Sequence, residues 1–317
     1  MTDEFLTEAE DEADDTAEAA PAGDPFVFQR QRAAEAGGFL IELEHHVLTY
    51  LPGRGERLIV SFDNLAAMRE LHDRELWGQR FLAAQGFDML GVQIKRRDWF
   101  RDAEVIAELE KLRDQGFFRR FPKVSMYGSS MGGFGALAFA PLSPGCTVMA
   151  FAPQRSLDAA LCPFETRYRY ARQITDWSLR YGDAAEGLKA AGRTYIAFDP
   201  AVPEDRQHVE ALVAPNVTLL PMRHMGHKLP PALLKMGLLK TISLAAFEGG
   251  LELPEFARMM RARRDSMPWR VDFLRRAGNA GHLRPALLLV DKMMAQQPHW
   301  KLRHVRRELV AALRAAS

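Results

Sequence analysis

The sequence is poor in cysteine and has no long apolar run. Only Cys146 and Cys162 occur among 317 residues, and two cysteines cannot form the disulfide framework of a small secreted protein. Nothing places them with histidines at metal-site spacing, so we expect no metal and no other cofactor. No stretch approaches the roughly 20 apolar residues that span a bilayer. The N-terminus also lacks a basic stretch followed by an apolar one, so we expect no signal peptide and a cytoplasmic protein.

Positive charge is missing from the first 24 residues, which carry ten acidic side chains and no Lys or Arg. A segment with so little to bury is predicted to be a disordered acidic tail. Residues 251–317 show the opposite imbalance, with fourteen Lys and Arg against six Asp and Glu. Both segments are interpreted first as solvated surfaces. Two alternatives are that the tail folds back onto the basic segment, and that the basic segment binds an anionic partner. Nucleic acid is not the expected partner, because the basic residues belong to no recognised module.

The middle of the chain, residues 25–250, has the pattern of a globular domain. Hydrophobic residues make up 47% of the chain and charged residues 26%, an ordinary globular balance. Strand-like runs occur at residues 39–43, 46–50, 57–62, 87–94, 123–127, 147–151, 194–198 and 217–220, with helical patterns between most of them. This alternation predicts an α/β domain with a mainly parallel, doubly wound sheet and helices on both faces. Residues 251–317 are predicted to form a C-terminal helical appendage, with a hairpin broken at Pro298.

Functional residues of such a sheet follow the strands, and one motif does so here. The run Gly128-Ser129-Ser130-Met131-Gly132 contains Gly-x-Ser-x-Gly centred on Ser130. Ser129 does not fit the pattern, because Tyr127 stands two residues before it. The pattern is typical of a sharp strand-to-helix turn that exposes the serine hydroxyl, and small residues on either side let the strand and helix approach closely.

The run from Tyr127 to Leu137 resembles the nucleophile elbow of α/β-hydrolase-fold serine esterases with a Ser-Met-Gly-Gly signature. The resemblance covers roughly residues 55–245. It implies the α/β-hydrolase fold and a catalytic Ser, acid and His in that order along the chain.

The resemblance also implies where the acid and the base lie. The family's acid loop has an Asp a few residues before Val-Pro, and Asp199 fits that place at a strand end. Asp205 is the alternative acid. The base is expected after the last strand, where His227 follows a glycine as in family members and His224 is the alternative.

The implied mechanism is acyl transfer, with His227 as general base and Asp199 orienting its imidazole. The Met131 backbone N–H is the expected first donor of the oxyanion hole. The second donor is expected in the loop after the strand at 57–62, near Phe62 or Asp63. That loop reads Ser-Phe-Asp-Asn rather than the His-Gly-Gly type of many lipases, so a lipase is not implied.

Two further residues are candidates for the substrate pocket. Arg155 follows a strand on the same rim as Ser130 and is placed to pair with a substrate anion, while Trp177 is a candidate wall. The predicted function is a serine hydrolase, an esterase or thioesterase, that takes a small-molecule or glycan-linked acyl substrate through an acyl-enzyme on Ser130. One alternative is an acyltransferase to a sugar or other alcohol. The other is a non-catalytic protein whose basic helical segment binds a protein partner.

Overall fold

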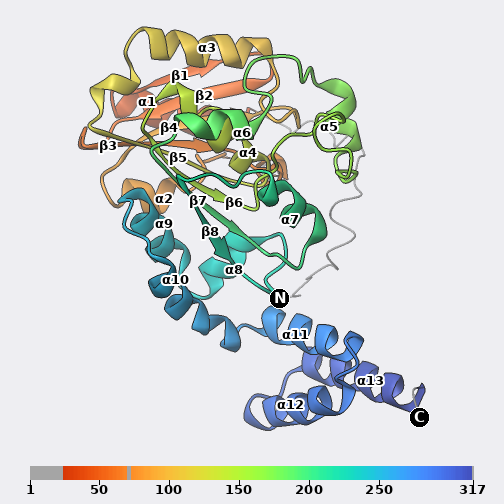
Figure 1. Cartoon of the computed structure of the whole chain (residues 1–317). Helices are drawn as coiled ribbons and strands as arrows, with labels where there is room; N and C mark the ends of the chain where they lie inside the picture. The colour runs from red at the N-terminus through yellow and green to blue at the C-terminus, as the bar shows by residue number, and fades with distance from the viewer. Residues whose placement is uncertain (1–23, 70–72, 316–317) are drawn as a thin grey trace.

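A single eight-stranded sheet lies at the centre of the computed structural model, which describes residues 24–69 and 73–315 (Figure 1). The strand order is β1-β2-β4-β3-β5-β6-β7-β8. β2 runs antiparallel to β1 and β4, and all the other neighbours are parallel. The strands are β1 (Phe39–Glu42), β2 (His46–Leu51), β3 (Arg57–Phe62), β4 (Asp88–Ile94), β5 (Lys123–Ser129), β6 (Thr147–Phe151), β7 (Arg193–Phe198) and β8 (Val217–Pro221). The acidic tail, apart from Asp24, lies outside the described residues.

Successive strand residues point to opposite faces of the sheet, so each face has its own core. In β3, Leu58 and Val60 pack on one face and Ile59 on the other. All six residues of β3 and all seven of β4 are buried. This is why these strands read as continuous apolar runs in the sequence rather than as alternating ones.

Helices cover both faces. The core cluster of one face includes buried residues of α3 (Ala103–Asp114), α4 (Met131–Ala138), α6 (Ala184–Gly187) and α7 (Pro203–Glu210). The cluster of the other face includes residues of α2 (Gln79–Ala83), α8 (Leu229–Lys235), α9 (Leu239–Phe247) and α10 (Leu253–Met259). The remaining α-helices of the sheet unit are α1 (Val27–Glu35) beside β1 and β2, and the short α5 (Arg169–Ile174). This arrangement is the α/β-hydrolase fold that the sequence predicts.

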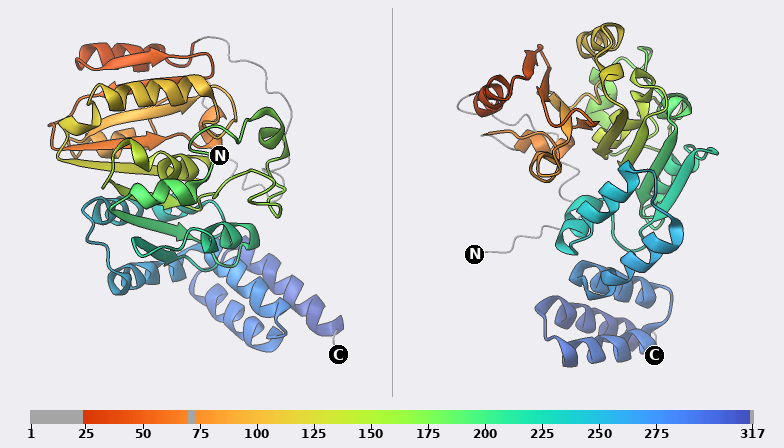
Figure 2. Two further views of the ribbon diagram at one scale, coloured as in Figure 1. Left: turned by 45° about the horizontal axis from the view of Figure 1, so that its top comes forward. Right: turned by 90° about the vertical axis from the view of Figure 1, so that its left-hand side faces the viewer.

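The C-terminal appendage is a unit of three helices, α11 (Met267–Asn279), α12 (Leu283–Gln296) and α13 (Trp300–Ala315). They share a small apolar cluster that includes Leu274, Val290 and Leu302. Figure 1 and both views of Figure 2 show the unit projecting from one end of the sheet. Pro298 lies between α12 and α13, where the sequence predicts the hairpin to break.

The composition places the start of the appendage after residue 250, but the residues that follow still pack against the sheet. Leu251, Phe256 and Met260 belong to the core cluster of the sheet. The separate cluster of the appendage starts with α11, where Met267 packs at its edge. Residues 251–265 are therefore packed as part of the sheet unit, although their composition is that of the appendage.

Among the described residues, no single helix is both long and apolar enough to cross a membrane. Only α8 and α9 taken together pass that test by length and composition, and they are bent by 114°. Both helices contribute buried side chains to the core, among them Leu233 and Phe247.

Both cysteines are buried and neither forms a disulfide. Burial raises the pKa of Cys146 to about 12. Burial likewise raises the pKa of Cys162 to about 11, and the positive charge of Arg155 offsets only part of this.

Candidate active site

Ser130 stands at a sharp turn between β5 and α4, as the Gly-x-Ser-x-Gly pattern predicts. Its φ is 53° and its ψ −119°, a backbone conformation that costs a non-glycine residue about 1–3 kcal/mol. The turn places the side chain at the carboxyl ends of the strands, where ligands bind in open α/β sheets. Ser130 is also the residue that precedes the first turn of α4, whose N–H groups point toward it.

Gly128 and Gly132, two residues before and after Ser130, pack so closely against neighbouring backbone that no side chain fits. A Cβ on Gly128 would lie 2.0 Å from the Gly132 carbonyl oxygen, and a Cβ on Gly132 would lie 2.4 Å from the Phe62 carbonyl oxygen. No side chain fits in either place. The turn therefore requires the small residues that the sequence motif provides.

His227 and Asp205 complete a hydrogen-bonded chain from Ser130. His227 Nε2 is 3.0 Å from Ser130 Oγ, and His227 Nδ1 is 2.7 Å from Asp205 Oδ2. Burial works to raise the pKa of Asp205, but the hydrogen bond from His227 and the charge of Arg167 outweigh it and lower that pKa. An ionised carboxylate only accepts hydrogen bonds. Nδ1 therefore carries the imidazole proton, and Nε2 is left to accept the proton of Ser130.

Asp199, the acid expected from the resemblance, does not contact His227. Its Oδ2 accepts hydrogen bonds from the backbone N–H groups of Met225 and Gly226 at 2.8 and 2.9 Å, and its Oδ1 accepts from Ala201 N–H. The reason lies in the chain between the two aspartates. Asp199 directly follows β7 and turns onto the backbone of the histidine loop, whereas Asp205 lies in the first turn of α7 and reaches the imidazole. The expectation about which aspartate meets the histidine is thus corrected to Asp205.

A second buried layer lies behind Asp205. Arg167 donates to Asp205 Oδ1 at 3.0 Å and forms an ion pair with Glu165, whose other neighbour is His208 Nε2 at 2.9 Å. Glu165 and His208 are fully buried. Burial works to raise the pKa of Glu165, but hydrogen bonds from His208 and Arg167 outweigh it and bring that pKa to about 2.

This second layer is absent from the sequence expectations. Glu165 and Arg167 come from the long segment between β6 and β7, and His208 comes from α7. No motif or period links residues that meet only when that segment folds over the sheet. Glu165 and Arg167 stand two residues apart, but oppositely charged residues at this spacing are also common on exposed surfaces, so the sequence carries no specific signal for the layer.

The expected oxyanion residues are found close to Ser130, with one correction. Met131 begins α4 directly after Ser130, and a first-turn N–H has no partner within its own helix. Phe62 ends β3 and pairs with strands on both sides. The Asp63 N–H donates to the Val92 carbonyl oxygen at 3.1 Å. Asp63 therefore does not offer the available donor that was expected of it.

The other expected residues make structural contacts. Arg155 forms a two-bond ion pair with Asp183, at 3.0 and 2.7 Å, rather than presenting its guanidinium to a substrate. Trp177 packs edge-on against Phe134 of α4, with ring centroids 5.7 Å apart. His224 Nδ1 is 3.2 Å from Asp272 on α11, and the histidine whose imidazole meets Ser130 is His227.

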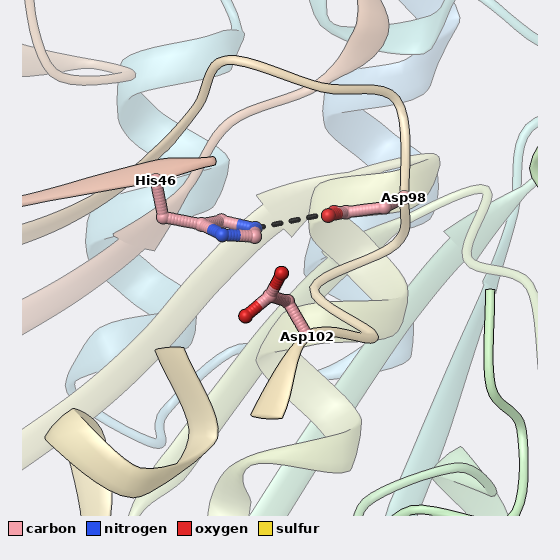
Figure 3. Close-up of side chains that lie close together, drawn as sticks. All are labelled: His46, Asp98 and Asp102. Carbon is pink, nitrogen blue, oxygen red and sulfur yellow. Dashed lines mark hydrogen bonds and ion pairs between the residues drawn. The ribbon is translucent and has the colours of Figure 1, made fainter. Parts of the chain in front are cut away.

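One further group of titratable side chains lies near this edge of the sheet. His46 on β2, Asp98 after β4 and Asp102 before α3 have ligand atoms within 4.8 Å of one another (Figure 3). Arg96 already donates to both carboxylates, at 3.1 and 3.2 Å. The positive charge that two neighbouring carboxylates require is thus supplied by the chain itself. We interpret the group as a partly buried ion-pair network that orders the loop after β4.

No protein-family model matches this chain, and no curated protein matches its sequence. Similar solved structures include the capsule O-acetyltransferase of Neisseria meningitidis serogroup A. It is 12% identical over 66% of this chain and 94% of that chain, with a TM-score of 0.42. TT1662 from Thermus thermophilus is 18% identical over 67% of this chain and 98% of that chain, with a TM-score of 0.43. FphF, a fluorophosphonate-binding serine hydrolase of Staphylococcus aureus, is 11% identical over 66% of this chain and 96% of that chain, with a TM-score of 0.42. Likenesses this distant carry no conclusion about the activity of this chain.

Proposed function

We propose that this chain is a serine hydrolase that cleaves an ester or thioester through an acyl-enzyme on Ser130. The observation that carries the proposal is the unbroken chain of hydrogen bonds from Ser130 Oγ through His227 to Asp205, at 3.0 and 2.7 Å. A hydroxyl becomes a nucleophile when an adjacent base accepts its proton, and the base needs a third group to orient it.

The roles follow from the positions of the three groups. His227 Nε2 takes the Ser130 proton while Oγ attacks the carbonyl carbon, and it returns that proton to the leaving group. Asp205 holds Nδ1–H and stabilises the imidazolium that forms. Together with His227, Arg167 favours the ionised form of Asp205, since it donates to the other carboxylate oxygen at 3.0 Å. Ser130 and His227 are partly exposed, so an acyl group can reach them from solvent.

A fluorophosphonate probe tests the proposal, because it labels a serine only where base and oxyanion donors activate it. We expect the wild type to be labelled, and Ser130→Ala and His227→Ala to lose labelling while remaining folded. Ser129→Ala is the matched control, since it removes the neighbouring hydroxyl of the same turn and is expected to keep the label. Folded wild-type protein without label would overturn the proposal and favour the non-catalytic alternative.

The acyltransferase alternative uses the same acyl-enzyme and differs only in the acceptor. Release of p-nitrophenol from acetyl and butyryl esters, measured with and without added glycans, separates the two. If a glycan speeds the reaction and itself becomes acylated, the glycan rather than water is the acceptor of the acyl group. Hydrolysis at a rate independent of glycan agrees with the hydrolase that we propose.

A further inference from the structure

Gln154 is a buried amide that touches the proposed nucleophile and has no part in the mechanism described so far. It lies three residues beyond the end of β6 and is fully buried. Its Nε2 is 3.3 Å from Ser130 Oγ, and its Oε1 is 3.1 Å from Trp99 Nε1. The polar end of Gln154 therefore stands between Trp99 and the hydroxyl of Ser130.

Trp99 fixes which way the amide points. The indole N–H is a donor only, so Gln154 can present only its oxygen to Trp99. The NH₂ group must then face Ser130. The chemistry of its partner thus fixes the orientation of the amide.

The donor capacity of this amide is only weakly used within the chain. The contacts of Nε2 are 3.3 Å to Ser130 Oγ and 3.5 Å to the Ala152 carbonyl oxygen, longer than the usual distance of about 2.9 Å. A buried amide costs free energy unless it is well hydrogen-bonded. An oxygen that binds beside Ser130 Oγ would give Nε2 the stronger acceptor that it lacks.

The backbone around this contact is strained. Four of the seven non-glycine residues with positive φ in the described part of the chain lie here: Trp99 and Phe100 after β4, Ser130 after β5 and Ala152 after β6. Each such conformation costs about 1–3 kcal/mol and persists where its surroundings enforce it. Asp98 enforces part of it by accepting the Phe100 N–H at 3.0 Å. Strain concentrated at three strand ends indicates that the placement of Trp99 and Gln154 matters to the site.

We propose that Gln154 Nε2 is the second donor of the oxyanion hole, beside the Met131 N–H. This inference rests on the proposed function and supplies the donor that Asp63 does not. When Ser130 Oγ bonds to the carbonyl carbon, the π electron pair moves to the carbonyl oxygen and the serine proton moves to His227. Gln154 donates to that oxygen without losing its proton. When the intermediate collapses, the electron pair returns, the leaving group departs, and His227 protonates it.

The test replaces the amide with an apolar side chain of similar length and measures the reaction with the fluorophosphonate probe. Gln154→Met is expected to lower the second-order rate constant of labelling by about 10²–10³. The affinity for a trifluoromethyl ketone, which forms an oxyanion on the serine, is expected to fall by a similar factor. A methyl ketone of the same shape, which stays unreacted, is expected to bind as before. Gln79→Met, a buried glutamine on α2, is the matched control and is expected to leave all three values unchanged.

The readouts separate chemistry from folding. Poor folding lowers the fraction of protein that is labelled, whereas loss of an oxyanion donor lowers the rate constant of the folded fraction. Trp99→Phe is the second variant, since it keeps Gln154 but removes the N–H that orients it, and it is expected to give a smaller drop in the same rate constant. Unchanged rate and ketone affinity in folded Gln154→Met, or in folded Trp99→Phe should Gln154→Met not fold, would overturn the inference. A wild type that is never labelled would instead count against the proposed function.

Discussion

The charges behind Ser130 and the charges on the C-terminal helices are held in opposite ways. Glu165 and Asp205 are fully buried and share Arg167, which is itself almost buried. On the helices, Arg275 and Glu308 form an ion pair with 47% and 41% of their side chains exposed. The first set is fixed in one geometry by its burial, whereas water competes for every member of the second. The buried charges therefore lie where the Asp205 carboxylate must be held in a fixed position.

The largest expected effect falls on the buried carboxylate that meets the imidazole. Asp205→Asn is expected to lower the turnover of a p-nitrophenyl ester by about 10⁴, because the amide favours the wrong tautomer of His227. Asp199→Asn is the matched control, because its carboxylate holds only backbone N–H groups. We expect that variant to keep most of its turnover. Its free energy of unfolding, measured with urea, is expected to fall by about 1–3 kcal/mol. A folded Asp205→Asn with normal turnover would contradict the assignment.

An acid titration probes the same buried layer with a smaller effect. The pKa of Glu165 is about 2 in the folded chain against an ordinary 4.5. A depressed pKa stabilises the fold at pH values above the ordinary one, and the gain disappears as pH falls from 4.5 toward 2. We expect Glu165→Gln to remove on the order of 3 kcal/mol of the acid dependence of unfolding. The measurement is the free energy of unfolding in urea from pH 6 to pH 2.5 for the wild type and Glu165→Gln. The same dependence on pH in both proteins would refute the expectation.

The smallest effect is expected at the exposed pair. In a double-mutant cycle of Arg275→Ala and Glu308→Ala, we expect a coupling energy below about 1 kcal/mol, because both side chains are well solvated. Leu302→Ala in the same unit is the comparison, since it removes a fully buried side chain and should cost about 2–5 kcal/mol. A coupling energy as large as that loss would remove the contrast between the two regions.

Much of this architecture was predictable from local patterns. The eight strands coincide with apolar runs, and the signal is strongest in strands such as β3 and β4, which are buried throughout. Ser130 was identifiable because its turn requires glycine at two fixed positions. His227 was expected from the resemblance, which places the base after the last strand, and its Nε2 lies 3.0 Å from Ser130 Oγ.

The remaining features depend on contacts between distant segments, which leave no period in the sequence. Asp199 and Asp205 are six residues apart and both lie near a strand end, so only the turn into α7 decides which of them reaches the imidazole. Arg167 comes from a segment with little regular structure, and besides Glu165 of that segment it meets Asp205 of α7. Composition placed residues 251–265 with the basic appendage, although Leu251 and Phe256 pack against the sheet.

The burial of both sulfur atoms bears on how the protein will respond to covalent reagents. Alkylation needs the thiolate, and with pKa values of about 12 and 11 for Cys146 and Cys162 that form is scarce at neutral pH. Iodoacetamide and maleimides should therefore leave the native protein untouched, and inactivation by them would report unfolding. Under the proposed function, activity lost after treatment with a serine-directed agent is accordingly assigned to Ser130 rather than to a thiol.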